Sequence, residues 1–302
     1  IEMEKSSDET VASCIILGFK RGNGDLEPLL IPLEPGNNVF DADDEFIKES
    51  LGLEKERGAF IGTLDGRKNL KVFLDLNKIL TKHVCILAKS GSGKSYSAGV
   101  LLEEIMEEKI PLLIIDPHGE YSSIKKPNKK DNDKLGSLGL SSKGYADVLQ
   151  EYSPDITINS DCLPLKLSAK SLTPEMLVHL MPAKLSNAQL GILYSALQNR
   201  NNIDFDDLIF TIDAEDNNLK YTVLNIIEYI KKLEIFSDKA TSLQELIKTS
   251  KASILNLRGV QPEVSEMVVY KLLKDLFDAR KRGNVPPFFL VIEGAHNFCP
   301  ER

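Results

Sequence analysis

The chain has 302 residues, of which 42% are hydrophobic and 27% are charged. This composition excludes a disordered chain and leaves enough length for two or three domains. With 37 Lys and Arg against 45 Asp and Glu, the net charge is −8, so any nucleic-acid contact has to be local. No apolar run approaches the ~18–20 residues that span a bilayer, and four dispersed cysteines without a CxxC pair favour a reducing, cytoplasmic location.

The first 80 residues alternate short apolar segments with turn residues such as Pro35-Gly36 and Asp65-Gly66. This rhythm predicts a small β-barrel or sandwich, interrupted by one short helix over 44–51 that ends at Gly52. We interpret residues 1–80 as an N-terminal β-barrel that serves as a subunit-interface or positioning domain. A ligand-binding domain is the alternative, but the segment has no paired carboxylates or metal-ligand spacing.

Residues 83–95 have the pattern of a phosphate-binding loop. The apolar run 84–87 predicts a buried strand, Gly91 and Gly93 let the backbone turn its N–H groups inward, and an amphipathic helix follows. The segment matches G-x-x-x-x-G-K-[ST] except that Ala88 stands at the first glycine. The residues predicted to contact a nucleotide are Ser90, Gly91, Ser92, Gly93, Lys94, Ser95 and Tyr96.

Lys94 and Ser95 are the two side chains of this loop with a predicted chemical role. Lys94 is expected to reach the β- and γ-phosphates of ATP and to take part in catalysis, and Ser95 is expected to ligate Mg²⁺. The alternative is a turn rich in Gly and Ser that binds nothing. Because strand, loop, Lys-Ser pair and helix follow one another in register, the nucleotide site is favoured.

A second apolar run, over 112–115, predicts a buried strand of a parallel sheet. It is followed by Asp116, His118 and Glu120. Ligands of open α/β sheets bind at the carboxyl ends of the strands, so these three residues are candidates for positions adjacent to the site. For His118, a loop histidine that holds a turn is an equally good interpretation.

Residues 122–250 differ in character from the segments before them. A polar loop with five lysines between 125 and 134 is interpreted as solvated. Helix signals follow, namely Thr173-Pro174, capping boxes that start at Ser186 and Ser242, and an amphipathic run over 221–233. We therefore expect a helical insertion.

Sheet character returns at 253–259, followed by a long helix over 262–279 that ends in Arg280-Lys281-Arg282. Cations are expected at a helix C-terminus, and we prefer this interpretation of the three residues to a DNA contact. The next apolar strand, 288–292, ends in Glu293. P-loop NTPases hold Mg²⁺ with such an acid, so Glu293 is predicted to organise the metal and to act in catalysis.

Together these segments resemble the HerA family of hexameric DNA translocases, within the HerA/FtsK class of RecA-like motors. The loop 88–95, the run Asp116-Pro117-His118-Gly119-Glu120-Tyr121 and the run Ala295-His296-Asn297-Phe298 carry the resemblance. It implies an α/β fold with a RecA-like P-loop NTPase core (81–121 and 251–302), a small N-terminal β-barrel (1–80) and an inserted helical domain (122–250). It also implies a homo-hexameric ring that moves double-stranded DNA using ATP and Mg²⁺, works with a NurA-type nuclease in DNA-end resection, and involves no membrane.

The chain departs from the family pattern at Gly294, where a catalytic glutamate is usual, and in its end at Arg302, before the family's sensor and arginine finger. Loss of a general base slows hydrolysis by about 10²–10⁴-fold and leaves nucleotide binding intact. Either Glu293 serves both tasks, or the chain is a nucleotide-binding assembly module with weak or no hydrolysis. We also expect the sequence to be part of a longer polypeptide, with ~150–200 further C-terminal residues on domain-size grounds. A small-molecule kinase is disfavoured because no acceptor site is visible.

Overall fold

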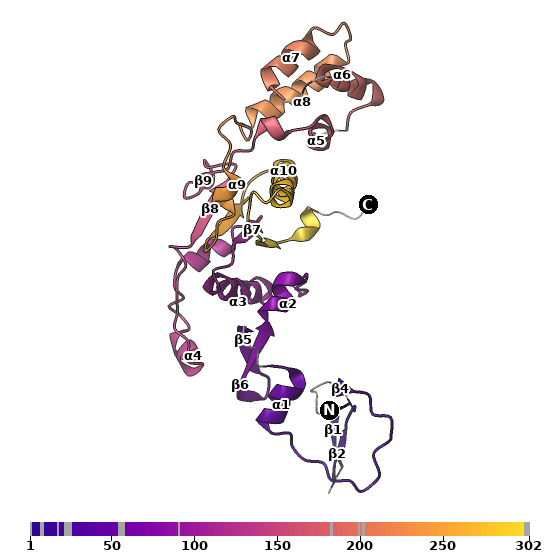
Figure 1. Cartoon of the computed structure of the whole chain (residues 1–302), viewed down its shortest axis with the longest axis vertical. Coiled ribbons are helices and arrows are strands. Elements are labelled where there is room, and N and C mark those ends of the chain that lie inside the picture. Colours follow the sequence, from indigo (N-terminus) through magenta and orange to yellow (C-terminus); the bar gives the residue numbers. More distant parts are fainter. Residues whose placement is uncertain are drawn as a thin grey trace. The chain divides into compact units, whose positions relative to one another are not determined.

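The structure is a computed structural model that describes residues 2–6, 9–16, 18–20, 26–53, 58–89, 91–181, 184–198, 200 and 203–298. The chain divides into two compact units, residues 1–101 and 102–302 (Figure 1). The division falls inside a helix and not at residue 80, where the predicted N-terminal domain ends. Each unit is described by itself below.

The described strands of the first unit pair only within antiparallel hairpins. These are β1 (Glu2–Ser6) with β2 (Glu9–Ser13), β3 (Phe19–Lys20) with β4 (Leu26–Glu27), and β5 (Gly58–Leu64) with β6 (Arg67–Asp75). One of the short apolar segments, 29–33, forms no strand, and its Leu30 and Ile31 are exposed. The β-barrel predicted for residues 1–80 is therefore not confirmed.

Two short helices of the first unit begin at capping aspartates. In α1 (Asp44–Leu51), the Asp43 carboxylate accepts a hydrogen bond of 2.7 Å from the Phe46 N–H, and Gly52 ends the helix in the left-handed conformation (φ 60°). This confirms the helix predicted over 44–51. Asp75 caps α2 (Leu76–Thr81) in the same way.

The strand predicted over 84–87 is wrong. These residues form no strand, and Val84, Ile86 and Leu87 are 47%, 38% and 89% exposed. An apolar run becomes a strand only where another strand offers N–H and C=O groups, and none of the described residues pairs with it. Cys85, which belongs to this run, is exposed for the same reason.

The second unit is built on a parallel sheet whose described strands follow the order β11-β7-β10-β8-β9. The strands are β7 (Leu112–Asp116), β8 (Leu149–Ser153), β9 (Leu163–Pro164), β10 (Ala252–Asn256) and β11 (Phe289–Ile292). Every residue of β7 and β10 is buried, as the continuous apolar run 112–115 predicts for β7, and β10 buries the polar Ser253 and Asn256 as well. β11 lies at the edge of this order and its residues are only half-buried.

Two strands of this sheet come from the segment predicted to be a helical insertion. β8 pairs with β10, and β9 pairs with β8. The first part of segment 122–250 thus contributes strands to the sheet, and the prediction of a purely helical insertion is corrected there. The sequence of β8, Leu-Gln-Glu-Tyr-Ser, carries polar residues that hide the strand signal. Its Glu151 is nevertheless buried, because other side chains satisfy its carboxylate.

Helices dominate the rest of this segment, and α6, α7 and α8 lie together in Figure 1. They are α4 (Asn132–Ser137), α5 (Pro174–His179), α6 (Asn187–Leu197), α7 (Phe205–Asp213), α8 (Lys220–Lys232) and α9 (Leu243–Leu246). The predicted cap at Thr173 and the capping box at Ser186 are confirmed. The box at Ser242 is wrong, because its hydroxyl donates to the Gln244 side chain instead of accepting from the helix backbone.

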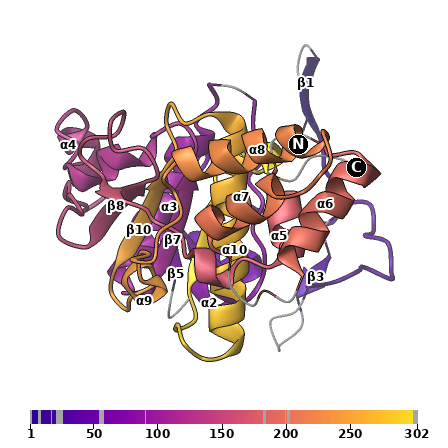
Figure 2. The ribbon, with the colours of Figure 1, turned by 90° about the horizontal axis from the view of Figure 1, so that it is seen from above.

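The long helix α10 (Pro262–Lys281) confirms the helix predicted over 262–279, and the chain leaves it through Gly283 (φ 75°). Figure 2 shows α10 alongside strands β7 and β10. Its Val268 and Leu272 are fully buried in one core with Ile115 of β7. Among the described residues, no helix is long and apolar enough to cross a membrane.

Candidate functional site

The predicted phosphate loop lies in the first unit and turns through two glycines. Gly91 and Gly93 have φ of +77° and +91°, in the left-handed region that favours glycine. The turn is held from inside, since the N–H and the hydroxyl of Ser92 both donate to the Lys89 carbonyl, at 3.1 and 2.6 Å. Ser90, also predicted to contact the nucleotide, lies outside the described residues.

The loop leads directly into α3 (Lys94–Glu107). The first N–H groups of a helix have no partner within the helix and carry its positive dipole end, so they attract anions. No heavy atom of the described residues, chain neighbours aside, lies within 4 Å of a Cβ built on Gly91 or Gly93. The exposed loop therefore has open space beside its backbone for a phosphate group, at the point where Lys94 and Ser95 begin the helix.

In the second unit, the carboxylate of Asp116 builds the loop after β7. One oxygen (Oδ1) accepts from the N–H groups of residues 118, 119 and 120 at 2.8–3.2 Å, and the other (Oδ2) accepts from the Tyr121 N–H at 3.0 Å. Burial raises the pKa of this carboxyl group above its ordinary value, although the four N–H donors act in the opposite direction. Asp116 thus holds the loop, while His118 and Glu120 are exposed on it.

Glu293 directly follows β11 and lies next to this loop. Its N–H donates to the Ile115 carbonyl at 3.0 Å, and its side chain is buried, with the residue only 7% exposed. The Tyr121 hydroxyl donates to Glu293 Oε2 at 2.5 Å. Burial, and then the hydrogen bond to this carboxylate, raise the pKa of Tyr121 well above its ordinary value, so the hydroxyl remains a donor at neutral pH.

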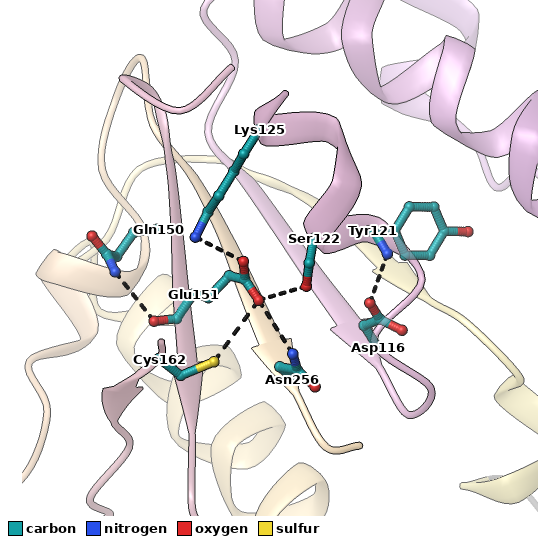
Figure 3. Close-up of polar contacts among 8 residues, drawn as sticks. All are labelled: Asp116, Tyr121, Ser122, Lys125, Gln150, Glu151, Cys162 and Asn256. Carbon is teal, nitrogen blue, oxygen red and sulfur yellow. Dashed lines mark hydrogen bonds and ion pairs between the residues drawn. The ribbon is translucent and has the colours of Figure 1, made fainter. Parts of the chain in front are cut away.

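A buried acid that the sequence did not single out, Glu151, gathers the neighbouring polar side chains (Figure 3). Lys125 forms an ion pair with Glu151 at 2.7 Å, and Ser122 and Asn256 donate to the same carboxylate at 2.6 and 3.2 Å. Lys125 was interpreted as part of a solvated loop, and that interpretation is wrong for this residue. The available signal was an acid in the middle of the short strand-like run 149–153.

The charge state of this cluster follows from its contacts. Burial alone would raise the pKa of Glu151, but the hydrogen bonds from Lys125, Ser122 and Asn256 and the Lys125 charge outweigh it, so the pKa is lowered. The Cys162 thiol lies 3.8 Å from Glu151, and burial, followed by the charge of Glu151, raises its pKa to about 11. Glu151 is therefore ionised at neutral pH, and Cys162 is a protonated thiol.

The residue after Glu293 has a backbone reason to be glycine. Gly294 adopts φ 59° and ψ 43°, and its carbonyl accepts from the Asn297 N–H in the short 3₁₀-helix Ala295–Asn297. A Cβ at this position would lie 3.0 Å from the Asn297 side-chain nitrogen. Any other residue here would therefore be strained by the left-handed backbone conformation and crowded by the Asn297 side chain.

The predicted site residues thus form two groups. Gly91, Ser92, Gly93, Lys94, Ser95 and Tyr96 lie in the first unit, and Asp116, His118, Glu120 and Glu293 lie in the second. Among the described residues, no cluster of three or more His, Cys, Asp or Glu side chains could hold a metal ion. In nucleotide sites, Mg²⁺ takes one or two protein oxygens and completes its shell with phosphates and water. Ser95, in the first unit, carries a hydroxyl oxygen, and Glu293, in the second, carries a carboxylate; each is an oxygen donor of the kind that Mg²⁺ takes.

Comparison with known proteins identifies a family. Residues 59–276 match the family described as "Helicase HerA, central domain". The "DNA double-strand break repair helicase HerA" of Pyrococcus furiosus is 34% identical over 122 residues, which cover 40% of this chain and 21% of the relative. The protein of the same name in Sulfolobus acidocaldarius is 27% identical over 282 residues, or 88% of this chain and 53% of the relative.

Two further similarities extend over most of the chain. The "Probable helicase MJECL08" of Methanocaldococcus jannaschii is 24% identical, with 99% of this chain and 62% of the relative covered. In each of these relatives the match spans less than two thirds of the relative's own length. The solved structure of VirB4 of Thermoanaerobacter pseudethanolicus matches with a TM-score of 0.50 at 15% identity, covering 82% of this chain and 70% of that one. The fold is accordingly an α/β, RecA-like core with a parallel sheet.

Proposed function

The chain belongs to the HerA helicase family, and we propose that it is a subunit of an ATP-dependent double-stranded DNA translocase that acts in DNA-end resection and repair. The observation that carries this proposal is the glycine turn at 91–93, open on its outer side and leading into the N-terminus of α3. Such a turn binds phosphate through backbone N–H groups. The names of the relatives support the DNA-repair role.

In the proposed reaction, each of three side chains has one task. Lys94 binds the β- and γ-phosphates, Ser95 donates its hydroxyl oxygen to Mg²⁺, and the Glu293 carboxylate orients the water ligands of the metal. When bound, Mg²⁺ supplies charge that stabilises the transferring phosphoryl group. The backbone of residues 90–93 and the ring of the exposed Tyr96 complete the proposed nucleotide contacts.

The proposed partners follow from the family. We propose a homo-oligomer, a hexameric ring in the cytoplasm, with double-stranded DNA in its channel and a NurA-type nuclease bound to it. A net charge of −8 is compatible with this assembly, because a ring can concentrate its cations along the pore that contacts phosphates. Electron micrographs of the purified protein test the ring directly: closed rings support this assembly, and monodisperse single subunits contradict it.

The activity is tested by ATP hydrolysis at low salt, with and without linear double-stranded DNA. We expect DNA to stimulate hydrolysis by the wild type, and Lys94→Ala to abolish it. Lys89→Ala is the matched control, because Lys89 lies in the same exposed loop and its described contact with the turn is made by the backbone carbonyl, which the variant keeps. Equal activity of wild type and Lys94→Ala would contradict the role given to Lys94.

The second candidate function is a nucleotide-binding assembly module without turnover, and Gly294 favours it. The test is Gly294→Glu beside Gly294→Ala, since both place a Cβ in the left-handed position and only the first adds a carboxylate. A gain in hydrolysis for Gly294→Glu over Gly294→Ala indicates that the wild type lacks a base. Hydrolysis by the wild type that neither variant increases indicates that another residue, such as Glu293, activates the water.

A further inference from the structure

Tyr121 connects the loop after β7 with the acid after β11. The residue is 2% exposed, and its hydroxyl donates to Glu293 Oε2 at 2.5 Å, across 172 positions of sequence. Both partners are buried, so water does not compete for this hydrogen bond. A hydrogen bond from a neutral donor to a charged acceptor is stronger than one between neutral groups.

The backbone at Tyr121 is anchored on one side by Asp116. The Tyr121 N–H donates to Asp116 Oδ2 at 3.0 Å, while Asp116 Oδ1 holds residues 118–120. Asp116 itself stands at the end of the fully buried strand β7. The position from which the Tyr121 side chain starts is therefore set by the central part of the sheet.

The other side of Tyr121 is anchored by Glu151. Tyr121 begins a 3₁₀-helix, Tyr121–Lys125, and this helix is tied to the Glu151 carboxylate through Ser122 and Lys125 (Figure 3). Glu151 also accepts from Asn256, at the end of β10. Three neighbouring strands, β7, β10 and β8, thus fix the helix from which the tyrosine hydroxyl reaches Glu293.

The hydrogen bonds described for the other side chains of the loop lead elsewhere. His118 and Glu120 are exposed, and both oxygens of Asp116 are occupied by backbone N–H groups. Tyr121 is the side chain of segment 116–121 for which the structure describes a hydrogen bond to Glu293.

We propose that Tyr121 is a positioning residue, whose hydroxyl orients the Glu293 carboxylate for its metal from a helix anchored by Asp116 and Glu151. This inference rests on the proposed function, in which Glu293 organises Mg²⁺. A group that orients a metal-organising side chain affects metal affinity even though it never touches the metal. Tyr121 therefore acts on the Mg²⁺-dependent part of nucleotide binding, not on the contacts of the loop 91–95 with phosphate.

The test compares Tyr121→Phe with Tyr145→Phe by equilibrium binding of a fluorescent ATP analogue, in Mg²⁺ and in EDTA. Tyr145 is the matched control, because it is also a buried tyrosine that donates to a glutamate, Glu107, at 2.8 Å. The measured quantity is the ratio of the affinity for the ATP analogue in Mg²⁺ to its affinity in EDTA. We expect Tyr121→Phe to reduce this ratio by about tenfold, the lower end of the effect of such positioning groups. The affinity in EDTA should not change, and Tyr145→Phe should change neither value.

A double variant separates positioning from a general structural effect. Once Glu293→Ala has removed the carboxylate, adding Tyr121→Phe should leave the affinity ratio unchanged. A further fall in that background overturns the proposal, since Tyr121 would then act elsewhere.

The outcomes also distinguish this proposal from the proposed function. If the wild type binds equally well in Mg²⁺ and in EDTA, the role of Glu293 fails and that of Tyr121 fails with it. If the wild type needs Mg²⁺ and Tyr121→Phe keeps the same ratio, the role of Tyr121 alone is overturned.

Discussion

Glu151→Gln removes one charge from the buried cluster that Glu151, in the middle of β8, forms with Lys125, Ser122 and Asn256, and it keeps the shape of the side chain. The Glu151 side chain is 6% exposed and that of its partner Lys125 is 25% exposed. Removing one partner of a fully buried ion pair costs about 3–5 kcal/mol. Because the Lys125 ammonium is partly exposed and can turn toward water, we expect Glu151→Gln to lower the free energy of unfolding by less, about 2 kcal/mol.

The reciprocal variant, Lys125→Met, should lower the free energy of unfolding by more than Glu151→Gln does. It leaves the more deeply buried group, the Glu151 carboxylate, with the neutral donors Ser122 and Asn256 and without a cation. The double variant Glu151→Gln with Lys125→Met should be less destabilised than the sum of the two single variants, because no unpaired charge remains.

The loss of unfolding free energy caused by Glu151→Gln should depend on pH. The pKa of Glu151 is lowered in the folded protein, so its stabilisation is present above the pKa of the unfolded chain and is lost as pH falls through the folded value. The ordinary pKa of a glutamate side chain is 4.5, so the difference in unfolding free energy between wild type and Glu151→Gln should be constant near neutral pH and shrink below about pH 4.5.

Urea unfolding followed by circular dichroism, from pH 7 to pH 3, measures these differences. Glu245→Gln is a suitable control, because this glutamate is itself exposed on α9 and no ion pair is described for it. If Glu151→Gln lies within about 0.5 kcal/mol of wild type at pH 7, the usual range for surface changes, the reasoning is refuted. A difference that does not shrink in acid would refute the electrostatic part.

Three further predictions follow from single contacts. Asp116→Asn replaces one acceptor oxygen by an amide nitrogen, which cannot accept from the Tyr121 N–H when it faces that group. The variant should lower the free energy of unfolding by about 1–3 kcal/mol and speed amide hydrogen exchange at residues 118–121. Unchanged exchange would contradict the role of Asp116. Gly294→Ala should lower the unfolding free energy by about 1–2 kcal/mol and Gly294→Asn by less, since Asn tolerates φ near 59°; equal melting temperatures of the two variants would contradict this. Alkylation at pH 8 with mass spectrometry should label Cys14 and Cys85, which are exposed, long before Cys162, which is buried with a pKa raised to about 11; rapid labelling of Cys162 in the folded protein would contradict its burial.

The parts of the fold that depend on neighbouring sequence could be predicted. The local signals are the continuous apolar run of β7, the caps at Thr173 and Ser186, and the glycines that end α1 and α10, and the structure contains each of them. The turn through Gly91 and Gly93 and the start of α3 at Lys94 were predictable for the same reason.

The parts of the fold and of the site that depend on partners distant in the sequence could not be predicted. Strand β8 is polar at Glu151, and that acid is buried only because Lys125, Ser122 and Asn256 meet it. The run 84–87 has strand composition, but composition supplies no hydrogen-bond partner. Glu293 was found from its place after an apolar strand, whereas its contact with Tyr121 required the sheet to bring β7 and β11 together.

The central claim, that the loop 91–95 binds the phosphates of ATP, is tested most directly by a titration of the wild type, Lys94→Ala and Lys89→Ala with Mg²⁺-ATP under equal conditions. Loss of a charge-assisted contact to phosphate corresponds to roughly 1.5–3 kcal/mol, so Lys94→Ala should bind at least about tenfold more weakly than the wild type. Lys89→Ala should bind as the wild type does. Equal affinity of wild type and Lys94→Ala, or no measurable binding by the folded wild type, would contradict the claim.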